Sequence, residues 1–113
     1  MKLSEIVARL ELQVHTGESL LDREVTGGYV SDMLSDVIGN APEGSLWVTM
    51  QKHQNIVAVA VMKSLAAIVL VNGREPEPET ASKAGEEGVV ILSTPRRAFE
   101  LVGRLHGLGI GSA

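Results

Sequence analysis

Apolar residues recur along this chain at helical and strand spacings that alternate from one segment to the next. Residues 3–10 carry apolar side chains at positions 3, 6, 7 and 10, the spacing of one helix face, and Ser4 or a neighbouring residue can cap this helix. Residues 12–15 alternate apolar and polar side chains, which is typical of a short strand. A second extended piece is predicted around residues 22–26, ending at Gly27-Gly28.

A helix is predicted over residues 29–38, because its apolar side chains follow helical spacing: Val30, Met33, Leu34, Val37 and Ile38. The polar side chains take the other face, where Asp32 and Asp36 stand four residues apart. That spacing puts the two carboxylates together, and we interpret them as the solvated side of the helix. Gly39-Asn40 is predicted to end the helix, and residues 46–50 to form a strand.

Residues 56–62 alternate valine and alanine, so they fit a strand as well as a helix. A strand would need a hairpin turn at residues 63–65, and Lys-Ser-Leu contains none of the residues that favour one. We therefore predict a buried helix over residues 55–63 and a buried parallel strand over residues 66–71. A polar helix over 79–87 and a strand over 89–92 follow.

Ser93-Thr94-Pro95 has the form of a helix cap followed by a first-turn proline. The helix predicted after it directs four side chains inward and ends at His106-Gly107: Ala98, Leu101, Val102 and Leu105. The glycines at 107, 109 and 111 are interpreted as a flexible end, since no helix follows them. Strands and helices alternate over the last two-thirds, which predicts a three-layer α/β/α sandwich on a mostly parallel or mixed sheet.

Length and composition indicate one domain over residues 1–113, with 44% apolar residues and no cysteine. The absence of cysteine excludes disulfides, zinc–thiolate sites and thiol catalysis. A net charge of −4 and 3% aromatic residues argue against binding to nucleic acid or to anionic lipid. No apolar run approaches the roughly 20 residues of a membrane span, and the N-terminus does not resemble a signal peptide. We expect a cytoplasmic protein.

The sequence contains no recognisable catalytic motif. A phosphate-binding loop of the P-loop type needs Gly next to Lys, and no such pair occurs. His15, His53 and His106 are far apart and lack a second ligand at metal-binding spacing. We therefore expect neither a metal, nor a cofactor, nor kinase or phosphatase activity.

Basic residues gather in the segments that leave three of the predicted strands: Lys52, Arg74, Arg96 and Arg97, four of the ten Lys and Arg residues. His53, Asn72 and Thr94 lie in the same segments. In an open parallel sheet, ligands bind beyond the carboxyl ends of the strands. Two of the segments also lead into helix N-termini, which favour anions. Two interpretations stay open: surface charges that happen to lie in loops, or a site for a phosphate, nucleotide or other anionic metabolite.

The stretch from Asp22 to Leu34 resembles the DRTGG domain family, whose letters stand here as Asp22, Arg23, Thr26, Gly27 and Gly28. Residues 47–51, 55–60, 66–73 and 91–95 also resemble that family, so the resemblance spans nearly the whole chain. It implies a fold similar to the N-terminal domain of HPr kinase/phosphorylase. Because the P-loop domain of that kinase is missing, the resemblance does not carry kinase activity with it.

DRTGG domains occur between CBS domains in some pyrophosphatases and within some phosphate acetyltransferases, as regulatory and dimerising modules. The resemblance therefore implies a non-catalytic homodimeric regulatory module, and the basic residues beyond the strands suggest a small anionic metabolite as what it senses. Stand-alone members resemble proteins encoded near redox genes, which implies an alternative: a ligand-free interaction subunit docking on a redox enzyme such as an iron hydrogenase. Gly27-Gly28, expected just before a helix, permits close approach of a ligand, of another chain or of the helix itself. The candidate ligand-binding residues are Arg23, Thr26, Gly27, Gly28, Lys52, His53, Asn72, Arg74, Thr94, Arg96 and Arg97.

Overall fold

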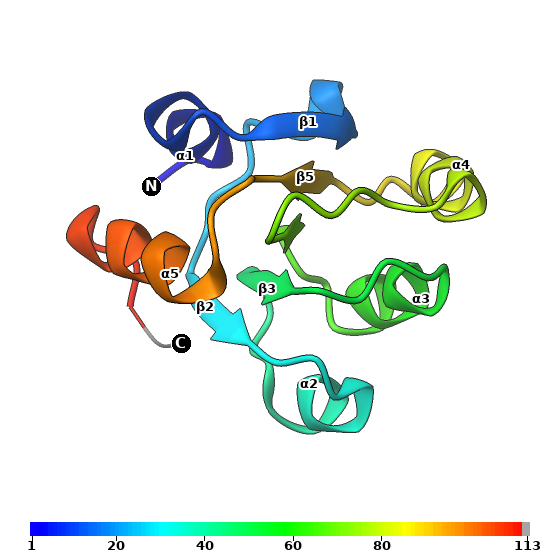
Figure 1. The fold of residues 1–113 in the computed structure, drawn as a ribbon. Coiled ribbons are helices and arrows are strands. Elements are labelled where there is room, and N and C mark those ends of the chain that lie inside the picture. The colour runs from blue at the N-terminus through cyan, green and yellow to red at the C-terminus, as the bar shows by residue number, and fades with distance from the viewer. Residues whose placement is uncertain (112–113) are drawn as a thin grey trace.

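The computed structural model describes residues 1–111, in which a five-stranded sheet has helices on both faces (Figure 1). The strands are β1 (Gln13–Thr16), β2 (Gly27–Val30), β3 (Ser45–Thr49), β4 (Ala67–Leu70) and β5 (Ile91–Ser93). The helices are α1 (Leu3–Leu10), α2 (Leu34–Asn40), α3 (Asn55–Met62), α4 (Pro78–Glu87) and α5 (Ala98–Gly107), with a 3-10 helix at Glu18–Leu20. The predicted three-layer α/β/α sandwich is confirmed.

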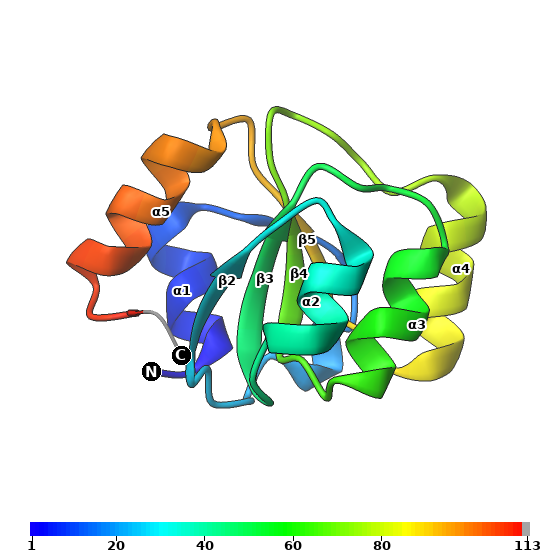
Figure 2. The ribbon, with the colours of Figure 1, turned by 90° about the horizontal axis from the view of Figure 1, so that it is seen from below.

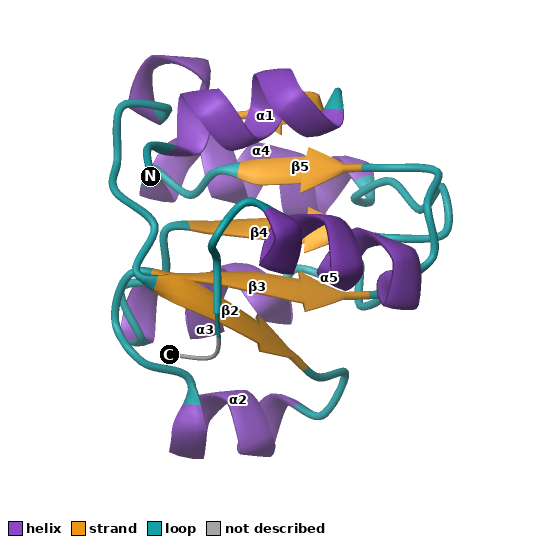
Figure 3. Cartoon of the chain, turned by 90° about the vertical axis from the view of Figure 1, so that its left-hand side faces the viewer, coloured by secondary structure: helices purple, strands orange, loops and turns teal. Residues whose placement is uncertain are grey.

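The handedness of the strand connections explains which helices cover which face. The sheet order is β1-β5-β4-β3-β2, and β1 pairs antiparallel with β5 while the neighbouring pairs from β5 to β2 are parallel. From β2 to β5 the chain steps along the sheet in one direction. Right-handed crossovers therefore put α2, α3 and α4 on the same face. The two helices outside these crossovers, α1 and α5, cover the other face (Figures 1 and 3).

Each face of the sheet has its own apolar core. Residues of β3 alternate between the two cores: Leu46 and Val48 face α1 and α5, whereas Trp47 lies in the core beneath α2, α3 and α4. The Trp47 side chain is fully buried, and its indole N–H donates to the Ser31 carbonyl at 2.9 Å. All residues of β3 and β4 are buried. Burial on both faces explains why these strands are nearly continuously apolar in sequence.

The presence of α3 confirms the prediction of a helix over residues 55–63, which was based on the lack of turn-forming residues at 63–65. After it, Ser64 takes a left-handed backbone conformation with φ of 52°, and the chain enters β4 as a parallel neighbour of β3. The other predicted strands and the helix over 79–87 are present, with ends shifted by one or two residues.

The region around β2 was predicted wrongly. The strand is Gly27–Val30, not the preceding residues 22–26, which contribute only an isolated bridge between Lys2 and Glu24. The helix begins at Leu34, so Val30 belongs to a strand. Of the five apolar residues assigned to the inner helix face, only Val37 is buried, and the Met33 side chain is 64% exposed. Pairing with β3 holds Tyr29 and Val30 extended, although the sequence pattern placed them in the helix.

The start of the last helix was also predicted wrongly. Ser93 ends β5, and the helix begins at Ala98 with no side-chain cap. Two hydrogen bonds tie the segment after β5 to the loop after β4: the N–H of Asn72 donates to the Arg96 carbonyl at 2.9 Å, and that of Gly73 to the Thr94 carbonyl at 3.0 Å. These loops lie side by side at the top of Figure 2. Of the four side chains predicted to point inward, Leu101 and Leu105 are buried, while Val102 is 37% exposed.

No helix within residues 1–111 is long and apolar enough to cross a membrane.

Candidate functional site

A crevice lies beyond the carboxyl ends of β2, β3 and β4, where an open α/β sheet is expected to bind ligands. Its volume is 210 Å³. Three valines, Val30, Val48 and Val71, are among its apolar lining residues. Its other lining residues are Ser31, Asp32, Thr49, Met50, Asn72, Arg97 and Ala98.

Asp32 stands at the end of β2 and holds the turn that follows β3. Its Oδ1 accepts a hydrogen bond from the Thr49 hydroxyl at 2.7 Å and another from the Met50 N–H at 2.8 Å. The Asp32 carbonyl accepts a third from the side-chain amide of Gln51 at 3.1 Å. Both bonds to the carboxylate fall on one oxygen. Asp32 therefore does not share a solvated helix face with Asp36, contrary to the sequence prediction.

Arg97 brings a positive charge to the same crevice. It is exposed and directly precedes α5, and within residues 1–111 no hydrogen bond or ion pair engages its side chain. Within residues 1–111 no side chain caps α5, so the N–H groups of its first turn lack a side-chain partner, and Ala98, the first residue of the helix, lines the crevice. An arginine beside uncapped helix N–H groups is a favourable environment for an anion.

Arg96 and Thr94 are part of the scaffold around the crevice. The Arg96 guanidinium donates to the Leu10 carbonyl at the end of α1 at 2.7 Å, and its Nε lies 3.8 Å from Oε1 of Glu100. Thr94 is buried, and its hydroxyl accepts a hydrogen bond from the Arg96 N–H at 3.2 Å. These contacts turn the Arg96 side chain toward α1.

The other residues proposed at this edge have different surroundings. His53 pairs with Glu77, with Nδ1 2.9 Å from Oε1. Lys52 is half-buried, and its carbonyl accepts a hydrogen bond from the Thr80 hydroxyl at 2.8 Å. The Asn72 side chain lines the crevice and contacts the sulfur of Met50 at 3.0 Å, while Arg74 is exposed in the loop after β4. Of the seven residues predicted to bind a ligand at the carboxyl edge, Asn72 and Arg97 line the crevice.

The residues of the DRTGG motif lie mainly at the opposite, amino edge of the sheet. Arg23 donates to the Ala66 carbonyl at 3.3 Å and to the Gly88 carbonyl at 3.0 Å, just before β4 and β5. The Thr26 hydroxyl donates to the Glu43 carbonyl at 2.8 Å, just before β3, and Gly27 begins β2. The structure therefore does not bring these residues together with Arg97.

An anion is disfavoured at that amino edge. Arg23 lines a hollow of 400 Å³ there, together with three carboxylates: Glu24, Glu43 and Glu87. Their negative charges oppose the binding of a phosphate beside Arg23. The contacts of Arg23 instead hold the beginnings of two parallel strands in place.

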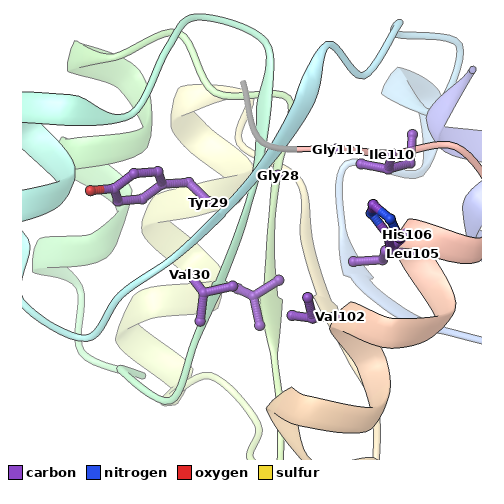
Figure 4. A pocket seen from close by; sticks show the side chains of 9 residues that line it. Gly28, Tyr29, Val30, Val102, Leu105, His106, Ile110 and Gly111 are labelled. Atoms are coloured by element: carbon purple, nitrogen blue, oxygen red, sulfur yellow. The ribbon is translucent and has the colours of Figure 1, made fainter.

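A second hollow, of 390 Å³, runs between β2 and α5 and adjoins the crevice at Val30 and Val48 (Figure 4). Val102, Leu105 and Ile110 point into it, whereas the ring of Tyr29 points away toward α2. Gly28 lines this groove and donates its N–H to the Gly111 carbonyl at 2.9 Å. Gly111, part of the glycine-rich segment interpreted above as flexible, is therefore bonded to the edge of the sheet.

Tyr29 and Asp36 form a pair on the other side of β2. The phenol donates to Oδ2 of Asp36 at 2.8 Å, which lowers the pKa of Asp36 below its ordinary value of 3.8. The same hydrogen bond raises the pKa of Tyr29 above its ordinary value of 10.0. The side-chain amide of Asn40 also donates to Oδ1 of Asp36 at 3.0 Å. This carboxylate therefore fixes the position of α2 against β2.

Asp32 is the charged crevice residue that the sequence prediction missed. The signal was its position directly after a strand, but the strand was assigned to residues 22–26 and Asp32 to a helix. Once Gly27–Val30 is known to be parallel to β3, residues 31–32 become a segment that leaves a carboxyl end. Among residues 1–111, no group of three or more His, Asp or Glu side chains is placed to hold a metal ion.

The DRTGG domain family model matches residues 5–108 of this chain. The fold is similar to a crystal structure of the CBS and DRTGG domains of the regulatory region of Clostridium perfringens pyrophosphatase, complexed with its activator diadenosine tetraphosphate. That likeness has a TM-score of 0.68 at 16% identity and covers 90% of this chain. The matched part is 44% of the regulatory-region chain in that structure, so this chain spans less than half of its length. A search of curated protein sequences finds no match. By the extent of the family match, this chain belongs to the DRTGG domain family.

Proposed function

We propose that this chain is a non-catalytic regulatory module that binds a small phosphorylated metabolite in the crevice at the carboxyl ends of β2, β3 and β4. The observation that carries the proposal is Arg97, an arginine without a protein partner within residues 1–111, which lines that crevice beside the uncapped start of α5. The pyrophosphatase region with a similar fold binds a phosphorylated nucleotide as its activator. Because that region also contains CBS domains, its ligand supports the proposal only by analogy.

The expected affinity is modest. A charge-assisted hydrogen bond contributes about 1.5–3 kcal/mol net, and Arg97 with the helix N–H groups supplies only a few such bonds. After the entropy of association is subtracted, binding in the micromolar to millimolar range is expected. The carboxylate of Asp32 and the net charge of −4 repel a phosphate and lower the affinity further. Salt screens the attraction that Arg97 exerts on the phosphate, so binding that depends on Arg97 should weaken as the salt concentration rises.

The test is a thermal-shift screen with ADP, ATP, acetyl phosphate and inorganic pyrophosphate, followed by titration calorimetry. Arg97→Ala should weaken binding about tenfold or more and flatten its salt dependence. Arg104→Ala is the matched control, because Arg104 lies on α5, which Arg97 directly precedes, and within residues 1–111 its side chain makes only an exposed pair with Glu100, at 3.4 Å. We expect the nucleotides to be recovered intact. If none of these compounds at millimolar concentration raises the melting temperature, the proposed ligand-binding function is wrong.

We also propose that the module is a homodimer, and the outer face of α3 supports this. The helix sequence is apolar almost all round, and a helix of that kind is normally buried. Yet Val61 is 47% exposed and Met62 62% exposed, beside a groove of 500 Å³ between α3 and α4. A second copy that places its α3 in this groove would cover both apolar surfaces at once.

The same apolar face also supports the second candidate function, an interaction subunit that docks on a redox enzyme and binds no ligand. The two candidates differ in their outcomes. A chain that is monomeric by itself, binds none of the phosphorylated compounds and co-purifies with a larger enzyme would favour the interaction subunit. Loss of that co-purification in Val61→Glu would locate the contact on α3.

A further inference from the structure

We infer that the crevice is selective for ribonucleotides, because the Asp32 carboxylate offers its second oxygen to the ribose hydroxyls. This inference rests on the proposed function and names the ligand class of the same site. The hydrogen bonds from Thr49 and Met50 both fall on Oδ1, at 2.7 and 2.8 Å. Within residues 1–111, Oδ2 accepts no hydrogen bond, and Asp32 is exposed at the crevice that it lines.

The Asp32 carboxylate is held in position. Its Oδ1 is fixed by two donors from the end of β3, and its main chain is fixed by the side-chain amide of Gln51 at 3.1 Å. The direction of Oδ2 is therefore set before a ligand arrives, and a pre-positioned acceptor loses little entropy when it binds. A carboxylate accepts from hydroxyl groups and repels phosphate oxygens. The oxygen thus favours the part of a ligand that carries neutral hydroxyls.

The rest of the crevice fits the other two parts of a nucleotide. Arg97 and the uncapped first turn of α5 favour phosphate. Val30 and Val48 line both the crevice and the adjoining groove, and Val102 adds to the apolar lining of the groove. An apolar surface of this kind can cover a flat base. At 210 Å³ the crevice is below the roughly 300 Å³ at which ligand pockets begin, and the groove extends it.

In parallel sheets that bind dinucleotides, an acidic side chain beyond a strand end accepts hydrogen bonds from ribose hydroxyls. Asp32 has the same position relative to β2, directly beyond its carboxyl end. Inorganic phosphate and acyl phosphates have no group that donates to Asp32. The crevice should therefore bind them more weakly than a ribonucleotide.

The experiment compares ATP, 2′,3′-dideoxy-ATP and inorganic tripolyphosphate by calorimetry on the wild-type chain and on Asp32→Asn. Asparagine keeps an oxygen for Thr49 and Met50 and replaces the second acceptor with a donor. In the wild type, ATP should bind about tenfold or more tightly than the dideoxy analogue. In Asp32→Asn that difference should disappear, while tripolyphosphate binds as well as or better than before. Asp22→Asn, an exposed change at the amino edge, is the matched control and should behave as the wild type.

Equal wild-type affinities for ATP and its dideoxy analogue would overturn the inference and leave the proposed phosphate site standing. Binding of tripolyphosphate without binding of ATP would overturn it as well. If neither ATP nor tripolyphosphate binds, both the inference and the proposed function fail. The comparison of ATP with its analogue uses the wild-type chain, so the inference stays testable even if Asp32→Asn does not fold.

Discussion

Arg23 joins the beginnings of two neighbouring strands through a single side chain. Its guanidinium donates to the carbonyls of Ala66 and Gly88, which precede β4 and β5. A carbonyl that is shielded from water and loses its hydrogen-bond donor destabilises the folded state, because no new hydrogen bond replaces the one it made to water when unfolded. At the residue scale, the arginine of the family motif therefore contributes to stability, at the edge of the sheet opposite the crevice.

We predict that Arg23→Ala lowers the free energy of unfolding by about 1–3 kcal/mol. It should leave the affinity for ATP unchanged, because the crevice lies at the other edge. Urea denaturation and calorimetry measure the two effects. Arg9→Ala removes an exposed arginine from α1 and should cost less than about 0.5 kcal/mol. If Arg23→Ala weakens the affinity for ATP without lowering the free energy of unfolding, Arg23 takes part in ligand binding and this prediction is wrong.

The pair of Tyr29 and Asp36 makes stability depend on pH. The Tyr29 hydrogen bond is the largest cause of the lowered pKa of Asp36, so the folded state favours the carboxylate. A lowered folded-state pKa contributes stability that is present above the ordinary value of 3.8 and is lost as the pH falls through the lowered pKa.

We therefore predict that Tyr29→Phe is less stable than the wild type near neutral pH, and that the difference shrinks in acid. Urea denaturation from pH 7 down to about pH 3 measures the difference, and a carboxyl carbon NMR titration follows Asp36. The pKa of Asp36 should rise in the variant. A stability difference that is constant across this range would show that the contribution of the phenol hydroxyl does not depend on the ionisation of Asp36.

At the element scale, one turn fixes how β1 joins the sheet. The β1–β5 register shifts between Val14 and Thr16, and the Thr16 hydroxyl bridges the strands: it donates to the Val89 carbonyl at 2.7 Å and accepts from the Ile91 N–H at 3.0 Å. Gly17 follows in the left-handed region with φ of 81°. A Cβ atom built on Gly17 would lie 2.6 Å from Cγ2 and 3.0 Å from Cα of Val90.

Gly17→Ala should destabilise the chain through two costs. The left-handed conformation costs an L-residue about 1–2 kcal/mol, and overpacking against Val90 adds about 1–3 kcal/mol. Gly73→Ala is the matched control, because Gly73 has φ of 70° but no heavy atom within 4 Å of a Cβ position. The difference between the two melting temperatures isolates the contact with Val90. Equal losses in the two variants would mean that the strand moves aside at no cost.

At the scale of the whole molecule, the three crossover helices lie on one face, and α3 presents exposed apolar side chains there. Monomeric proteins rarely expose a large contiguous apolar patch. The chain of 12.0 kDa should therefore associate through this face.

We predict a dimer of twice that mass by light scattering after gel filtration at micromolar concentration. Val61→Glu puts a charge on the outer face of α3 and should shift the mass to that of the monomer. Phe99→Glu is the control on the other face of the sheet, where Phe99 on α5 is 94% exposed. A wild-type mass near 12.0 kDa contradicts the dimer. Dissociation by Phe99→Glu alone would move the interface to α5.

The sequence by itself determined the class of fold and most of its elements. The run of apolar residues in β4, the missing turn residues at 63–65 and the alternation of strands with helices follow from local side-chain chemistry. Burial on both faces of a parallel strand requires such a run, and a hairpin requires particular residues at its turn. The family motif and the basic residues that follow the strands could also be identified from the sequence alone.

Only the tertiary structure decided where β2 lies, where α5 begins and which candidate residues meet. Val30 follows helical spacing but is extended because β3 supplies its hydrogen-bonding partner. The start of α5 is delayed because the loop after β4 bonds to Thr94 and Arg96. Arg96 and Arg97 are adjacent in sequence, yet one is bonded to Leu10 and the other lines the crevice. Each of these outcomes depends on contacts between residues far apart in the chain, which local propensity does not encode.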